Sequence, residues 1–320
     1  MSVRAPNHPL GGPIRRRRIC ASLVAGLVTL ISVGKTMAAT SPSTSERLQS
    51  HCTGRFDYAL PAALLSGGGK QSLYRLDVSS EPWRTGVESG DLWKKRLSAA
   101  LTAKGASATA PARTREFDLA GVGPAAWMAL FADRPDLVTL LAMKPVALSK
   151  ESVFLSAEAS AGREGVAEKV VTEVAAAYVA GSSQGFCTGA GAFVIRPSKN
   201  ERALESFNAP GVDVSVETET VAAPDDGQST DGEAPPGGRK LLKQRRNVGG
   251  FDGIEERVQV PDDAAGGLLV YTWIFAGRAA DGAAPRIRLS ASGPTSHSAA
   301  LDAAWNSLLT SWRQRPVGVR

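Results

Sequence analysis

Hydrophobic and polar residues alternate at many places along the chain, and a period of two predicts half-buried β-strands. The clearest case is 212–217, where three valines alternate with acidic and hydroxyl side chains. The segment 186–195 is apolar but rich in glycine, which predicts a strand with a bulge or a close backbone approach. The predicted strands cover residues 56–60, 73–78, 113–119, 135–141, 151–158, 186–195, 212–217, 254–260, 268–276 and 286–291.

Three segments have the 3.6-residue spacing of amphipathic helices. One helix is predicted over 91–104, where Asp91 could cap its first turn. Another is predicted over 163–179 and ends before Gly181, a natural C-terminal cap. A terminal helix has its leucines and tryptophans between 301 and 312 on one face, and we expect it to cover a sheet.

The order of these elements predicts an α+β fold with two domains of mainly antiparallel sheet and flanking helices. An N-terminal α+β domain is expected over 51–180, and a strand-rich C-terminal α+β domain over 181–320. Residues 224–238 consist largely of Pro, Asp, Gly, Ser and Glu, without a core residue. We interpret 224–238 as a mobile acidic loop in the C-terminal domain.

The N-terminus has the features of a secretory signal peptide over 1–39. Four arginines precede the apolar run 19–33, and Met37-Ala38-Ala39-Thr40 offers small residues for cleavage. The run is shorter than the ~20 residues of a membrane-spanning helix. We therefore expect export to the periplasm and no integral membrane segment after processing, with an uncleaved N-terminal anchor as the alternative. The polar residues 40–50 would form a tether.

The charge of the chain changes when this segment is set aside. The whole sequence has 37 basic and 31 acidic residues, a formal net charge of +6. Residues 1–39 contain six of the basic residues and no acidic ones, so the remainder is neutral. A neutral chain gives no support for nucleic-acid binding. The basic run 239–246 is interpreted as a solvated helix or strand edge, with a patch for phospholipid headgroups or an acidic partner as the alternative.

Two cysteines, Cys52 and Cys187, lie outside the signal segment. Thiols in an oxidising compartment tend to pair, so we predict a disulfide between them. The bridge would close a loop of more than a hundred residues, which the chain-entropy model values at ~4–5 kcal/mol. Two separately buried thiols are the alternative.

One motif has the pattern of a hydrolase. Gly181-Ser182-Ser183-Gln184-Gly185 fits G-x-S-x-G, and Asp252 or Asp281 and then His297 follow in the order of α/β-hydrolases. A nucleophile elbow lies between a buried strand and a helix, whereas here a predicted helix precedes and a predicted strand follows. We therefore expect no catalytic residue, and keep a serine hydrolase with Ser183 as nucleophile as a rival hypothesis.

No cofactor or metal site is expected either. Only His51 and His297 lie outside the signal segment, and no set of ligands has metal-site spacing. The glycines at 67–69 are misplaced for a phosphate-binding loop, and Gly189-x-Gly191 lacks the third glycine of a dinucleotide motif. The acidic residues of 224–238 lack the spacing of a calcium loop.

Three segments, taken in order, point to a family. The first is His51-Cys52-Thr53-Gly54-Arg55 with the strand that ends at Leu60-Pro61, and the second is Gly185-Phe186-Cys187 with the apolar strand after it. The third comprises Leu241-Leu242, Arg245-Arg246, Gly253-Ile254-Glu255-Glu256, Tyr271-Thr272-Trp273-Ile274-Phe275-Ala276-Gly277 and Pro285-Arg286-Ile287-Arg288-Leu289. In this order and spacing they resemble the periplasmic immunity proteins that neutralise type VI secretion phospholipase effectors. The resemblance covers residues 50 to about 293.

The resemblance implies a two-domain inhibitor that binds its cognate phospholipase effector and keeps the lid of that lipase from opening. It implies no catalytic residues and no cofactor, and structural roles for Gly54, Arg55, Phe186, Trp273 and the two cysteines. Arg55 heads a buried strand, so we expect it to pair with a carboxylate inside the fold. Contact residues do not carry over, because immunity interfaces vary with their effectors. A periplasmic envelope-binding module without a toxin partner is the third hypothesis.

Overall fold

The computed structural model describes residues 47–83, 88–103, 115–119, 121–122, 126–223, 237–261 and 266–318. The predicted signal peptide lies outside the described residues, as do most of the predicted tether and most of the acidic loop 224–238. In the part of the chain that is described, no helix is long and apolar enough to cross a membrane.

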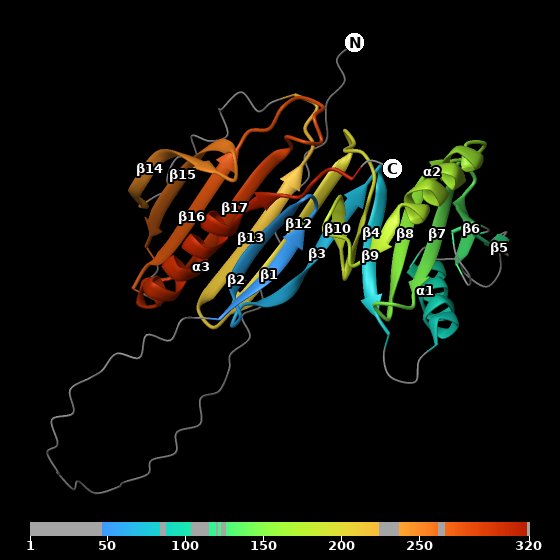
Figure 1. The fold of residues 1–320 in the computed structure, drawn as a ribbon, viewed down its shortest axis with the longest axis horizontal. Helices are drawn as coiled ribbons and strands as arrows, with labels where there is room; N and C mark the ends of the chain where they lie inside the picture. The colour runs from blue at the N-terminus through green and yellow to red at the C-terminus, as the bar shows by residue number, and fades with distance from the viewer. Residues whose placement is uncertain are drawn as a thin grey trace, which may run out of the picture. The chain divides into compact units, whose positions relative to one another are not determined.

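An antiparallel sheet of twelve strands runs through the described part of the chain in the order β14-β15-β16-β17-β13-β12-β3-β4-β8-β7-β6-β5 (Figure 1). The strands are β3 (Leu65–Leu73), β4 (Leu76–Pro82), β5 (Arg115–Asp118), β6 (Trp127–Arg134), β7 (Leu137–Val146), β8 (Glu151–Ser160), β12 (Glu201–Ala209), β13 (Val212–Glu219), β14 (Arg239–Val248), β15 (Phe251–Val260), β16 (Leu268–Phe275) and β17 (Arg286–Pro294). The pairing of β12 with β3 joins strands that are far apart in the sequence, with Glu205 opposite Gly69.

Two small sheets account for the other strands of the described residues. The first has the order β1-β2-β18, with β1 (Leu48–Thr53) at its edge, β2 (Phe56–Pro61) in the centre and β18 (Arg313–Gln314) beyond. The second has the order β10-β11-β9. Its strands are β9 (Tyr178–Ala180), β10 (Phe186–Thr188) and β11 (Gly191–Phe193).

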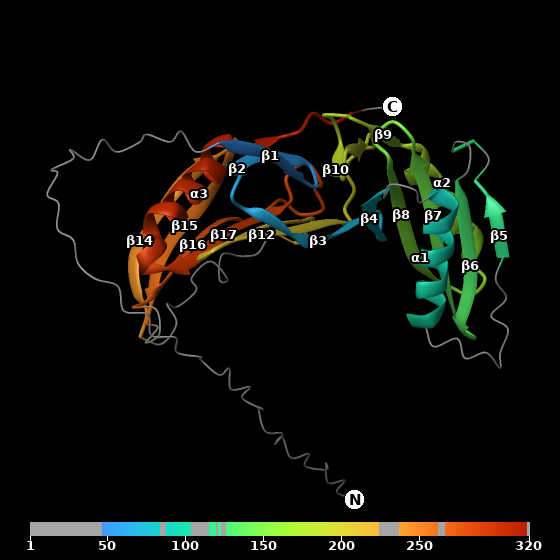
Figure 2. The ribbon, with the colours of Figure 1, turned by 90° about the horizontal axis from the view of Figure 1, so that it is seen from below.

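The first hydrophobic core lies between the large sheet and a cover made of α3 (Ser298–Ser311) and the β1–β2 hairpin (Figure 2). The terminal helix was predicted to cover a sheet, and its apolar face is buried as expected. Phe56 of the hairpin stacks on Trp312 just beyond the helix, with ring centroids 4.8 Å apart. The beginning and the end of the described chain therefore share one core.

The strands β6, β7 and β8 are covered on both faces. In β7, Leu140 and Ala142 belong to the core under α2 (Glu164–Ala176), whereas Leu141 and Met143 pack with α1 (Ser89–Ala103). Figures 1 and 2 show these two helices on opposite faces of the sheet. A strand buried on both faces is apolar throughout, which explains why its sequence does not alternate.

Two segments that the sequence predicts as single strands are hairpins. Residues 73–78 contain the turn between β3 and β4, where Tyr74 and Arg75 have φ of 56° and 67°. Such φ values at both central residues belong to a type I′ turn, which favours Asn and Gly, so the sequence carries no turn signal. Residues 186–195 contain β10, a turn and β11. The predicted close approach is present, since a Cβ on Gly185 would lie 2.2 Å from the Phe193 carbonyl oxygen.

Other element boundaries also move. The helix predicted over 163–179 ends at Ala176, because Tyr178–Ala180 pair with β11 as a strand. The predicted tether over 40–50 ends earlier, because Leu48 begins β1. No pattern predicted β6 or β12.

The α+β class with mainly antiparallel sheets is confirmed. The cores draw on both halves of the sequence. Phe56, Tyr58 and Leu60 lie in the core under α3, and Phe186 and Phe193 lie in the core under α2. The division into domains over 51–180 and 181–320 stays a prediction.

Candidate functional site

The predicted disulfide joins Cys52 of β1 to Cys187 of β10, with 6.3 Å between their Cα atoms. Beside it, the N–H of Cys187 donates to the carbonyl oxygen of Gly54 at 2.6 Å. Gly54 has a φ of +59°, and a Cβ there would lie 3.0 Å from Thr218 Oγ1. Glycine is therefore required where the two small sheets meet.

Arg55 points into the fold and is 2% exposed. Its Nε and Nη2 donate to the two carboxylate oxygens of Glu201, each at 2.8 Å, and Nη2 also donates to the carbonyl oxygen of Ile195. The backbone N–H of Ser198 donates to the same carboxylate at 2.6 Å. The two hydrogen bonds from Arg55 to Glu201, which we call the Arg55–Glu201 fork, hold the start of β2 against the start of β12. A side chain bound in this way is not available for a partner.

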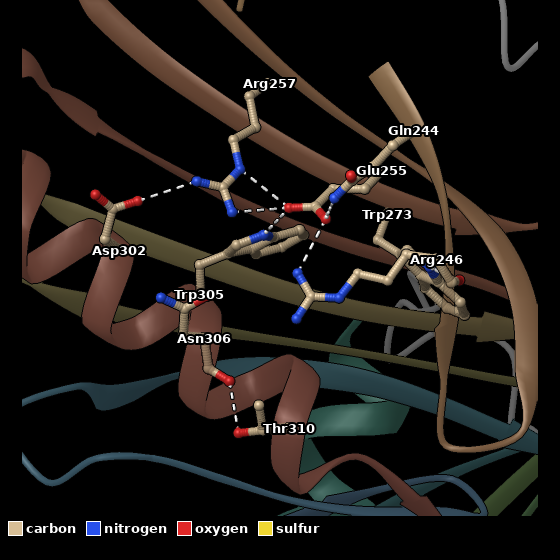
Figure 3. A network of polar contacts seen from close by, with 9 residues as sticks. All are labelled: Gln244, Arg246, Glu255, Arg257, Trp273, Asp302, Trp305, Asn306 and Thr310. Carbon is tan, nitrogen blue, oxygen red and sulfur yellow. Dashed lines mark hydrogen bonds and ion pairs between the residues drawn. The ribbon is translucent and has the colours of Figure 1, made fainter. Parts of the chain in front are cut away.

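Glu255 of β15 is the centre of a second buried network, with no exposed side-chain surface (Figure 3). Its carboxylate accepts hydrogen bonds of 2.9 to 3.0 Å from Gln244, Arg246, Arg257 and Trp305. Burial by itself would raise the pKa of Glu255, but these donors outweigh it and lower the pKa to about 2. Because Trp305 belongs to α3, the network fastens the helix to the sheet.

Trp273 of β16 lies beside this network and is fully buried. Its indole N–H donates to the carbonyl oxygen of Arg246 at 3.0 Å. The ring lies over Gly253, where an added Cβ would be 2.5 Å from the indole. The motif residues Gly253, Glu255 and Trp273 thus form one packed unit.

A polar cleft opens between the β1–β2 hairpin and the strands β3, β4 and β12, with a volume of about 560 Å³. Ser50, His51 and Cys52 of β1 line one side, and Gln71 of β3 and Glu205 of β12 line the other. We call it the hairpin cleft. It differs from the networks above because its carboxylate Glu205 has hydroxyl partners, whereas Glu201 and Glu255 have arginine partners.

Glu205 is the half-buried carboxylate of the hairpin cleft. It accepts hydrogen bonds from Thr53 Oγ1 at 2.9 Å and Ser66 Oγ at 3.4 Å. Burial raises the pKa of Glu205, and the two hydroxyl donors only partly oppose this. Among the described residues no Lys or Arg pairs with it, whereas Asp57 in the same cleft pairs with Arg315 at 2.7 Å. Glu205 therefore keeps an uncompensated charge.

Neither family models nor curated protein sequences match this chain. Solved structures do match. The apo structure of the immunity protein TplEi of the type VI secretion system (T6SS) from Pseudomonas aeruginosa has a TM-score of 0.68 at 16% identity, covering 84% of this chain and 98% of that chain. A chain of the crystal structure of the Tle4–Tli4 complex has a TM-score of 0.68 at 17% identity with the same coverage. TplEi complexed with "L" peptide gives 0.65 at 17% identity, again with that coverage.

The chain has the fold of T6SS immunity proteins. Identity of this order shows the fold alone, and the fold is the one that the sequence resemblance implied. The solved structures named above are of immunity proteins and of their complexes.

The immunity-protein fold does not bring the residues of the rival hydrolase together. Ser183 is exposed in the turn between the strands β9 and β10, and no helix follows it. His297 lies against the β12–β13 turn, where a Cβ on Gly211 would be 2.8 Å from its ring. Among the described residues, no hydrogen bond joins His297 to Ser183, Asp252 or Asp281.

The basic run 239–246 lies in β14, an edge strand of the large sheet, as one interpretation of the sequence expected. The neighbouring strand offsets much of its charge. Lys240 and Lys243 lie 3.6 and 3.2 Å from Glu256, and Arg246 pairs with Glu255. This arrangement weakens the alternative of an anion-binding patch.

Within the described residues, no group of three or more His, Cys, Asp or Glu side chains could hold a metal ion. The acidic residues considered for calcium, at 225, 226, 231 and 233, lie outside the described part. Sequence reasoning missed the hairpin cleft. The available signal was Glu205 itself, since Ala203 and Phe207 alternate with their neighbours and place this carboxylate on an apolar strand face.

Proposed function

We propose that this protein is a periplasmic immunity protein that binds a T6SS phospholipase effector and inhibits it sterically. One observation carries the proposal: the chain shares its fold with T6SS immunity proteins over 98% of their solved chains. One of these solved structures is the Tle4–Tli4 complex, in which such a fold is bound to another protein. The expected signal peptide over 1–39 agrees with a periplasmic location.

The contacts described above support steric inhibition by a rigid body. The disulfide fixes β1, the Arg55–Glu201 fork fixes β2, and the Glu255 network fixes α3. A preorganised surface loses little conformational entropy when it binds. An interface of at least ~1,000 Å² near the substrate cleft of the effector would block the lipid without any chemistry in this protein. In this proposal Gly54, Phe186 and Trp273 are structural.

The test uses residues 40–320 and the phospholipase encoded beside this gene. Phospholipid hydrolysis is recorded for each protein alone and for the mixture. We expect the lipase activity to be lost near one-to-one stoichiometry, with no hydrolysis by this protein alone. Unchanged lipase activity in the mixture would reject that lipase as the partner and favour the envelope-binding module. Hydrolysis by this protein alone that Ser183→Ala abolishes would instead establish the serine hydrolase.

A further inference from the structure

We propose that the hairpin cleft is the docking site for a cationic side chain, an arginine in the first place, carried by an extended loop of the partner protein. This inference rests on the proposed function, because it names the chemistry by which the immunity protein recognises its effector. It is drawn from the charge, the unsatisfied polar atoms and the glycine floor of the cleft.

The charge of the cleft is negative without compensation. Asp57 and Arg315 both line it and form an ion pair of 2.7 Å, and the exposed Arg313, which does not line the cleft, lies 3.8 Å from Asp57. Glu205 has only the hydroxyls of Thr53 and Ser66 as donors. A carboxylate held away from water without a counter-ion attracts a cation strongly, because little solvent screens the interaction.

A second carboxylate lies at the other end of the cleft. Glu151 is buried beneath Gly189 and Ser80, since a Cβ on that glycine would lie 2.4 Å from Glu151 Oε2 and from Ser80 Oγ. Its partners are neutral donors, namely the hydroxyls of Tyr178 and Ser149 and the backbone N–H of Ala190. No Lys or Arg of the described residues pairs with Glu151. Glu205 therefore lines the cleft, and Glu151 lies beneath its surface at Gly189.

The walls also carry polar atoms that lack a partner. His51 Nε2 and Gln71 Oε1 are shielded from water and form no hydrogen bond with any described residue. An unsatisfied buried polar atom is unfavourable for the folded state, and a donor that reaches it removes the penalty. The carboxylate and the amide oxygen only accept hydrogen bonds. A guanidinium group, with five N–H donors in a planar fork, complements such a set better than an ammonium group.

Of the glycines at 67–69, Gly69 borders the cleft and gives it space. Gly69 of β3 stands opposite Glu205, and no side chain rises from that position. A Cβ there would lie 2.4 Å from the Leu204 carbonyl oxygen, so the two strands approach closely only because the residue is glycine. Gly69 therefore forms the floor of the cleft beside the carboxylate.

The edge strand β1 indicates that the occupant is a peptide segment. Ser50, His51 and Cys52 are successive residues of β1, and all three line the cleft. β1 pairs with β2 on one side, and β10 meets its other side only at the Cys52–Cys187 bridge and Gly54. An extended chain can therefore pair with the open edge before Cys52 while its side chain enters the hollow. A volume of about 560 Å³ lies in the usual range of ligand sites and accommodates an arginine side chain.

The first test measures the affinity of the effector lipase for the full immunity chain and for its variants. Glu205→Gln removes the charge and keeps the shape of the side chain, and we expect it to weaken binding at least tenfold. Ser79→Arg adds a cation at an exposed position of the cleft wall and should weaken binding as well, without touching the core. The matched control is Glu217→Gln on the opposite face of the neighbouring strand, expected to stay within twofold. Affinities of the first two variants within twofold of the wild type would overturn the proposal.

The second test does not need the lipase. The chain is titrated with N-acetyl-arginine amide and, as the neutral analogue of the same shape, with N-acetyl-citrulline amide, while NMR follows the Gln71 amide and the His51 ring. We expect saturable shifts with the arginine probe only, and their loss in Glu205→Gln. Equal responses to the two probes, or none, would overturn the proposal. If the lipase neither binds nor is inhibited, the proposed function fails, and this titration still decides whether the cleft takes a cation.

Discussion

Glu255 and Glu205 are two inward carboxylates of the same sheet, and their surroundings are opposite. Glu255 accepts hydrogen bonds from two arginines, a tryptophan and a glutamine (Figure 3), and its pKa falls to about 2. Glu205 accepts hydrogen bonds from two hydroxyls and has a raised pKa. One charge is fully compensated by the chain, and the other is not.

The difference distinguishes a carboxylate that stabilises the fold from one that is available to bind a partner. A buried carboxylate with every oxygen bonded to a fixed donor holds elements together and has nothing left for a ligand. An inward carboxylate without a counter-ion is unfavourable in the free protein, and it becomes favourable when a partner supplies the missing cation. Both glutamates lie on the face that α3 and the β1–β2 hairpin cover, so burial alone does not distinguish them.

The largest expected effect comes from breaking the wall of the hairpin cleft at its disulfide. Replacing Cys52 and Cys187 together by serine should lower the free energy of unfolding by about 4 kcal/mol, because the bond closes a loop of 135 residues. Urea denaturation measures this loss. Amide hydrogen exchange should rise in β1, beside Glu205, and stay unchanged in β15, beside Glu255. Equal acceleration in both strands would contradict the separation of the two regions.

The second-largest effect is expected from a substitution in the Glu255 network. Glu255→Gln leaves Arg246 and Arg257 facing a neutral group inside the fold, and we expect a loss of about 3 kcal/mol in urea denaturation. The control is Glu217→Gln, which breaks a partly exposed pair with Arg202 and should lose less than about 1 kcal/mol. If both substitutions had the same small effect, the Glu255 network would not stabilise the contact between α3 and the sheet as its geometry indicates.

The sequence predicts the elements around Glu255 far better than the elements around Glu205. The alternation of 254–260 and 268–276 and the amphipathic terminal helix gave three neighbouring elements of the core, and the structure has all three. Period-two alternation and 3.6-residue spacing are local properties, so a single sequence is sufficient to detect them. The pairing of Cys52 with Cys187 was also predictable, because only two cysteines lie outside the predicted signal peptide.

The hairpin cleft depends on contacts that no local pattern contains. Its walls come from β1, β3 and β12, and Glu205 lies more than 130 residues after Gln71 in the sequence. All three strands were missed in whole or in large part, because β1 begins within a polar stretch, β3 consists mostly of exposed polar and glycine residues, and no pattern predicted β12. The turn at Tyr74-Arg75, which joins β3 to β4, was missed as well. Neither residue type is typical of a type I′ turn, so the sequence predicted a single strand there.

The smallest expected effect is that of Glu205 on the pH dependence of stability. It is the most informative one, because its direction is opposite to that of Glu255. The pKa of Glu205 is raised, so the folded chain binds its proton more readily than the unfolded chain does, and this residue makes the fold more stable as the pH falls from the raised pKa toward 4.5. Glu255 does the opposite, since its pKa of about 2 gives stability that is complete above 4.5 and lost as the pH falls toward 2.

Urea denaturation of the wild type and of Glu205→Gln between pH 7 and 4.5 therefore isolates the contribution of Glu205 to the free energy of unfolding. The substitution should be neutral or stabilising at pH 7, within about 1 kcal/mol, because it removes an uncompensated charge. The advantage of the variant should shrink as the pH approaches 4.5, because the wild-type carboxylate takes up a proton as the pH falls. A loss at pH 7 as large as that of Glu255→Gln would mean that Glu205 is compensated within the chain after all, and the hairpin cleft would then have no charge to offer a partner.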